Sequence, residues 1–115
     1  LLQENRKISL SQVYATRTDQ RLSEILSDLE SQDQIAYQAE RRGQTEDEVR
    51  AFYTSMRTIV RFDNLLYQAE LGLIEEEELE TVRQLIIDFY PHWVESGARP
   101  YQRITKWYET NAPGT

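Results

Sequence analysis

The feature that most limits the fold of this chain is the scarcity of residues that interrupt helices. Only four glycines and three prolines occur among its 115 residues. The long stretches between them carry apolar residues at helical rather than alternating spacing. The sequence therefore predicts an all-α protein. We expect a compact helical bundle of three main helices plus two short helices, with an N-terminal helical stalk.

The middle of the chain carries the clearest helix signals. The stretch from Thr45 to Glu48 fits a capping box, in which a threonine hydroxyl and a glutamate carboxylate satisfy backbone amides at the helix start. Gly72 supplies the left-handed residue that commonly closes a helix. These signals predict a helix over residues 45–71, and a shorter helix is expected around residues 34–42. The apolar face of the longer helix comprises Val49, Phe52, Met56, Ile59, Val60 and Tyr67.

A second long helix is expected after the four glutamates at 75–78, because carboxylates are stabilised at the positive end of a helix. Consecutive glutamates point in different directions on a helix, so helix initiation is a better explanation for the run up to Glu80 than a divalent cation site. Pro91 either ends this helix or opens a short further turn. Gly97 breaks the chain, and Pro100 is expected at the first position of a last short helix.

The first 30 residues are also predicted to be helical, but their apolar side chains form two sets. Leu10, Val13 and Tyr14 centre on one direction, and the leucines and isoleucine between residues 22 and 29 centre about a third of a turn away. One straight helix cannot bury both sets on one partner. We therefore expect a stalk over residues 1–16, a bundle over 17–110 and a flexible tail over 111–115. Leu10, Val13 and Tyr14 form a candidate self-association face.

Charge and composition exclude several classes of function. The chain has 13 Lys and Arg against 20 Asp and Glu, a formal charge of −7, so no nucleic acid partner is expected. It has no cysteine and one histidine, so thiol chemistry and cysteine-based metal sites are excluded. Di-iron bundles use Glu-x-x-His, but Phe89 stands three residues before His92. No glycine-rich phosphate loop is present. No cofactor or metal is expected.

Two carboxylates, Asp63 and Glu70, fall on the apolar side of the predicted helix over 45–71 and should face inward. A buried carboxylate needs a partner, and Arg83, Arg99 and Arg103 are the candidates. One interpretation is a buried structural ion pair. The other is a polar pocket formed with Tyr67 and some of the later aromatic side chains, most of which we expect in the core. These aromatic residues are Phe89, Tyr90, Trp93, Tyr101, Trp107 and Tyr108.

Four stretches of the sequence form a pattern shared with other proteins: Arg61-Phe62-Asp63, residues 67–77, residues 86–90 and Trp93. This pattern resembles a broad family of uncharacterised bacterial proteins. The family has one N-terminal transmembrane helix followed by a small all-helical soluble domain. The resemblance implies that a membrane helix precedes Leu1. It also implies that the domain faces the cytoplasm at the bacterial inner membrane, because basic residues such as Arg6 and Lys7 favour that side.

Two hypotheses for function follow from the sequence. The leading one is a non-enzymatic, membrane-anchored helical domain that acts by protein interaction or self-association, as a homo-oligomer or with a protein partner. The alternative is a small-molecule-binding sensor or minor enzyme, with a carboxylate and aromatic pocket around Asp63 and Glu70.

Overall fold

The computed structural model describes residues 2–111, so the last four residues of the predicted tail lie outside the described part. Residues 2–111 contain five helices and no strand, which confirms the all-α prediction with three long and two short helices. The helices are α1 (Leu2–Glu30), α2 (Gln32–Arg42), α3 (Glu46–Glu70), α4 (Glu76–Glu95) and α5 (Gln102–Asn111).

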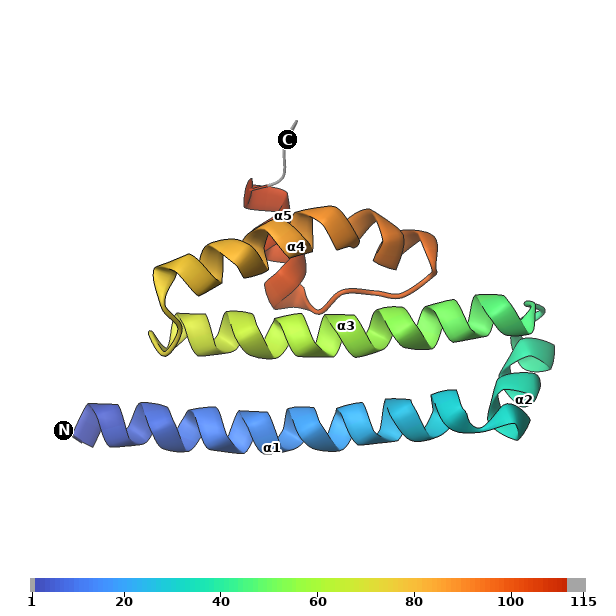
Figure 1. Cartoon of the computed structure of the whole chain (residues 1–115), viewed down its shortest axis with the longest axis horizontal. Coiled ribbons are helices and arrows are strands. Elements are labelled where there is room, and N and C mark those ends of the chain that lie inside the picture. The colour runs from blue at the N-terminus through green and yellow to red at the C-terminus, as the bar shows by residue number, and fades with distance from the viewer. Residues whose placement is uncertain (1, 112–115) are drawn as a thin grey trace.

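The three long helices lie side by side, with α3 between α1 and α4 (Figure 1). Neighbouring long helices run antiparallel. The short α2 connects α1 to α3 at one end, and α5 crosses behind α4 in the view of Figure 1 and contacts both α3 and α4. The molecule is flat, with extents of 52 × 35 × 20 Å. Since a helix with its side chains is about 10 Å across, the long helices form one layer and α5 adds a second over part of it.

Helix α3 occupies the centre because its apolar side chains cover two sides. On one side, Val49, Tyr53 and Val60 pack with residues of α1 and α2, including Ile25 and Ile35. On the other side, a larger cluster joins α3 to α4 and α5. Its buried members are Ile59, Phe62, Leu66, Val82, Ile86, Trp93, Ala98 and Ile104.

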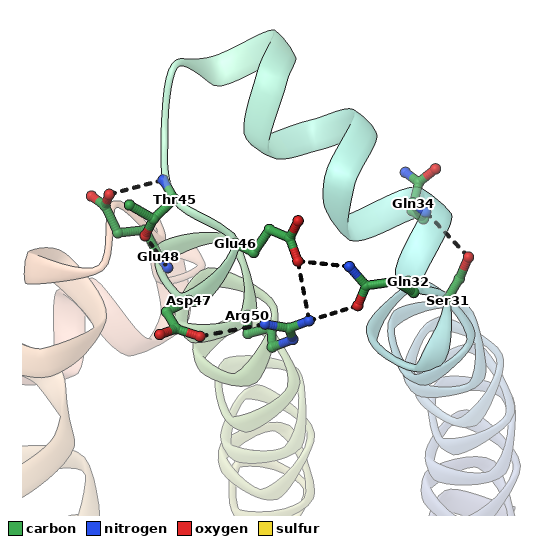
Figure 2. Close-up of polar contacts among 8 residues, drawn as sticks. All are labelled: Ser31, Gln32, Gln34, Thr45, Glu46, Asp47, Glu48 and Arg50. Atoms are coloured by element: carbon green, nitrogen blue, oxygen red, sulfur yellow. Dashed lines mark hydrogen bonds and ion pairs between the residues drawn. The ribbon is translucent and has the colours of Figure 1, made fainter.

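The turns on either side of α2 begin their helices with local side-chain caps (Figure 2). The Ser31 hydroxyl accepts a hydrogen bond from the backbone N–H of Gln34 at 3.2 Å. The predicted capping box is present at α3: the Glu48 N–H donates to the Thr45 hydroxyl at 3.1 Å, and the Thr45 N–H donates to the Glu48 carboxylate at 3.0 Å. Gly43, with φ of +65°, closes α2 in the left-handed conformation.

Exposed polar contacts fix the corner between α2 and α3 (Figure 2). The Gln32 amide donates to Glu46 at 2.6 Å, and the Arg50 guanidinium donates to the Gln32 carbonyl oxygen at 2.8 Å. Arg50 also contacts Asp47 at 3.3 Å. Each exposed ion pair contributes little stability by itself, so this network sets the direction of α2 more than it holds the fold together.

The end of the chain differs from expectation in two places. Helix α4 continues through Pro91 to Glu95. The turn after the proline is held in place because it contains Trp93, which is buried in the core and only 1% exposed. Helix α5 begins at Gln102 rather than at Pro100, so the prediction for Pro100 is wrong. The carbonyl of Tyr101 instead accepts the first hydrogen bond of α5, from the Thr105 N–H at 3.0 Å.

Helix α1 requires a correction to the predicted stalk. It is continuous from Leu2, and residues of the expected stalk already pack on α3: the Ser11 hydroxyl donates to Gln68, and the Tyr14 ring lies 4.2 Å from the Tyr67 ring. The prediction that residues 1–16 project from the domain is therefore wrong for residues 11–16. Only the first turns of α1 extend past the end of α3 (Figure 1).

None of the helices within residues 2–111 combines the length and the apolar character that crossing a membrane requires.

Candidate functional site

Asp63 is the most deeply buried charged side chain described, with 2% of the residue exposed. Both of its carboxylate oxygens accept hydrogen bonds. Oδ1 accepts from Nη1 of Arg103 at 2.9 Å, and Oδ2 accepts from the hydroxyl of Tyr14. Because Tyr14 lies on α1 and Arg103 on α5, one carboxylate of α3 connects three helices.

Arg103 makes most of the remaining contacts at this site. Its Nε donates to the Glu70 carboxylate at 3.0 Å, and its Nη1 also donates to the Tyr14 hydroxyl at 3.2 Å. The guanidinium carbon lies 5.0 Å from the centre of the Tyr67 ring, within the range of a cation–π contact. Tyr14, Asp63, Tyr67, Glu70 and Arg103 are called the Arg103 cluster below.

The electrostatics of the Arg103 cluster raise the pKa values of its two donors, Tyr14 and Arg103. Burial raises the pKa of Tyr14 above its usual value, and the hydrogen bond to Asp63 and the negative charge of Asp63 raise it further. Burial alone would lower the pKa of Arg103. The negative charge of Asp63 and the hydrogen bonds to Tyr14, Asp63 and Glu70 outweigh the effect of burial. The pKa of Arg103 is therefore raised.

The structure brings together some of the predicted site residues but not all of them. Asp63 faces inward and pairs with Arg103, which was one of its three predicted partners. The prediction that Glu70 faces inward is wrong: its side chain is 56% exposed, because it is the last residue of α3 and lies at the open end of the helix. Tyr67 packs against both Tyr14 and Arg103.

Arg83 was a candidate partner for the buried carboxylates, and that prediction is wrong. Its guanidinium contacts Glu76 at 3.0 Å and Glu80 at 3.4 Å, both on its own helix. The two glutamates lie three and seven residues before it, on the same side of α4, so local pairs form without any tertiary contact. Arg83 does line an open hollow of about 490 Å³ next to Glu70 and Arg103. Arg99 is exposed.

Tyr14 was predicted to belong to the self-association face with Leu10 and Val13, and the structure corrects this. Its ring and hydroxyl are both used inside the chain, while Leu10 and Val13 remain exposed. The spacing of residues along α1 could have predicted that Tyr14 faces α3. Tyr14, Thr18, Leu22, Ile25 and Leu29 follow one another at spacings of three or four, a continuous stripe once the polar Thr18 is accepted as a buried residue.

The chemistry of the Arg103 cluster is that of a closed ion pair. An open hollow of about 380 Å³ lies beside it, lined by Tyr14, Asp63, Glu70, Tyr101, Gln102, Arg103 and Lys106. Both oxygens of Asp63 accept hydrogen bonds within the chain, and Oε1 of the exposed Glu70 also accepts from Arg103, so the buried carboxylate has no oxygen left for a bound molecule. Within residues 2–111, no three Asp, Glu or His side chains are grouped to hold a metal ion.

A larger groove, which the sequence did not predict, lies between the first half of α3 and the second half of α4. It has a volume of about 820 Å³ and is called the α3–α4 groove below. No Lys or Arg is among its lining residues. Beside the turn before α3, the Oε1 atom of Gln44 is buried and accepts no hydrogen bond from the part of the chain described. The side walls include Glu48, Ala51, Thr54, Ser55, Thr58, Phe89, His92, Trp93 and Glu95.

Comparison of the chain with protein-family models, with curated proteins and with solved structures finds no match.

Proposed function

We propose that this chain is a non-enzymatic helical interaction module that associates with a second copy of itself through an exposed face of α1. The observation that carries the proposal is a strip of four exposed residues, Arg6, Leu10, Val13 and Arg17, called the α1 strip below. Leu10 is 42% exposed and Val13 is 53% exposed. Their spacing of four, three and four residues places all four side chains on one face of the helix.

The rotation of α1 about its own axis explains why these aliphatic side chains stay outside. The Tyr14 hydroxyl is bonded to Asp63, and the Tyr14 ring lies 4.2 Å from the Tyr67 ring in a tilted arrangement, so the side of α1 next to the α1 strip faces α3. Turning α1 to bury Val13 would break these contacts. An exposed apolar strip on a helix that cannot turn is best covered by another chain.

The alternative function, a carboxylate pocket that binds a small molecule, has less support. It requires Asp63 to offer a free oxygen to a ligand, but both oxygens of Asp63 are bonded to Arg103 and Tyr14, and Oε1 of Glu70 is bonded to Arg103 as well. The Arg103 cluster therefore favours a structural role, which is to fix α1 and α5 on α3.

Attachment to a bacterial membrane through an upstream helix, with the domain in the cytoplasm, stays a prediction within this proposal. Cell fractionation of the natural protein tests it. Recovery in the membrane fraction after a high-salt wash would support the attachment, and recovery in the soluble fraction would contradict it.

The self-association is tested with the double variant Leu10→Ser and Val13→Ser. The matched control is Ile8→Ser with Leu26→Ser, because these side chains are 44% and 40% exposed on the same helix but point to a different side. Light scattering coupled to size-exclusion chromatography should give the mass of a single chain for the first variant and the wild-type mass for the control. Equal masses for wild type and both variants would contradict the proposal.

A further inference from the structure

The charges of the α1 strip restrict the surface that can cover it. Its two aliphatic residues are flanked at both ends by arginines, and neither Arg6 nor Arg17 makes an ion pair within residues 2–111. If two α1 strips paired with each other in antiparallel orientation, the first arginine of one copy would face the second arginine of the other. Parallel pairing would also oppose like charges. The strip therefore fits a surface that is apolar and negative.

The charge distribution of the chain offers such a surface on another copy. Residues 2–21 carry four basic and two acidic side chains, which leaves nine basic and eighteen acidic residues in the rest of the sequence. The start of α1 is thus locally basic on an acidic protein. This asymmetry favours contact between α1 of one copy and a different part of the next copy.

The α3–α4 groove has the shape for a helix. Its α3 wall is built from the small residues Ala51, Thr54, Ser55 and Thr58, which allow close approach of another backbone. Its α4 wall presents Phe89, which is 41% exposed. From Glu48 to Thr58 this wall is about 15 Å long, and the α1 strip from Arg6 to Arg17 spans about 16 Å.

The polar groups of the groove also match the strip. Glu48 and Glu95 lie among the lining residues, and no Lys or Arg does. The buried Oε1 atom of Gln44 is an acceptor without a donor inside the described chain. An arginine guanidinium has five N–H donors, so an arginine at one end of the strip supplies both the charge and the missing hydrogen bond.

We propose that the α1 strip of one copy lies in the α3–α4 groove of a second copy. This inference rests on the proposed self-association and adds its second surface. Leu10 and Val13 then contact Phe89 and the small residues of α3. Because the strip and the groove are different surfaces, each copy uses its strip on one neighbour and its groove on the other, so the contact repeats head to tail.

The test blocks the groove without touching α1. Ala51→Arg places a long cation on the exposed wall of the groove, and arginine is well tolerated in helices. The matched control is Gln84→Arg, which adds the same charge at an exposed position of α4 outside the groove. Ala51→Arg is expected to weaken association by at least about tenfold in sedimentation equilibrium. Gln84→Arg is expected to associate as the wild type does, and circular dichroism shows whether each variant folds.

A mixing experiment distinguishes this inference from the proposal on which it depends. Ala51→Arg retains an intact strip, and the Leu10→Ser, Val13→Ser variant retains an intact groove. Mixed together, they should form a one-to-one complex, although neither associates alone. If Ala51→Arg associates as well as wild type while the strip variant does not, the groove inference is overturned and the self-association proposal stands. If the wild type is monomeric, both are overturned.

A second variant keeps the test independent of Ala51. Glu95→Lys removes an acid from the groove, whereas Glu77→Lys makes the same change elsewhere on the exposed surface of α4. The first should weaken association about threefold more than the second, as expected for loss of an exposed ion pair. Equal effects of the two variants would contradict the inference.

Discussion

Asp63 is buried where both of its oxygens accept hydrogen bonds from other helices. A carboxylate in such a place contributes to stability only as long as its partners remain. Removing one partner leaves the other without compensation in a site that water reaches poorly. At the scale of single residues, the stability that the Arg103 cluster contributes therefore depends on every one of its partners.

Asp63→Asn should lower the free energy of unfolding by about 1–3 kcal/mol, because the amide cannot satisfy Arg103 as a carboxylate does. Urea denaturation measures this loss, and the slope of the transition should stay unchanged. Glu70→Gln is the matched control. Its side chain is 56% exposed and it contacts the same guanidinium, so its loss should be about 0–1 kcal/mol. Equal losses for both variants would show that burial is not what makes Asp63 important.

Tyr14→Phe should cost about 1 kcal/mol near neutral pH, because Oδ2 of Asp63 loses its donor while the ring stays in place. The pKa of Tyr14 is raised above its ordinary value of 10.0, so the folded chain holds this proton more tightly than the unfolded chain. The contribution of Tyr14 is therefore complete below that value and is lost as the pH rises through the folded pKa. Urea denaturation at several pH values should show the wild type and the variant converging under alkaline conditions. A difference that grows with pH would contradict this account.

At the scale of helices, the start of α3 depends on a local cap. Thr45→Ala removes the hydroxyl that accepts from the Glu48 N–H and should cost about 1 kcal/mol of stability. Thr54→Ala is a matched control in the same helix, since that side chain is exposed and its change should stay within about 0.5 kcal/mol. Thermal unfolding followed by circular dichroism compares the two. A smaller effect at Thr45 than at Thr54 would mean that the capping box contributes nothing to α3.

The helices were largely predictable because their signals are local. The capping box, the glutamate run and Gly72 are read from neighbouring residues, and the start and end of α3 and the start of α4 lie close to where these signals place them. Two residues led to wrong predictions. Thr18 is polar but buried, so the apolar stripe of α1 was interpreted as two separate sets. Trp93 is buried in the core, and α4 continues past Pro91 to include it.

The candidate site was predictable only in part, because its contacts join residues far apart in sequence. The position of Asp63 on the inner side of a helix follows from periodicity. The choice of Arg103 over Arg83 depends on how α5 crosses α3, which no local pattern encodes. The α3–α4 groove is lined mainly by small and polar residues from two helices, and these residues form no recognisable motif in the sequence.

At the scale of the whole molecule, the length of α1 that the fold needs can be measured. Deleting residues 1–16 removes Ser11 and Tyr14, and should cost at least as much stability as Asp63→Asn. Deleting residues 1–9 removes mainly exposed side chains and should leave the midpoint of urea denaturation nearly unchanged. Equal stability of both truncated chains would contradict the packing of residues 11–16 on α3.

In this proposal α1 is fixed on α3 through Tyr14, and the adjoining α1 strip is available to a second copy. Sedimentation equilibrium of the unaltered chain from micromolar to millimolar concentration tests it most directly. The account predicts an average mass that rises above the 13.6 kDa of one chain with concentration and falls again when salt is added. A mass of 13.6 kDa at every concentration would contradict it.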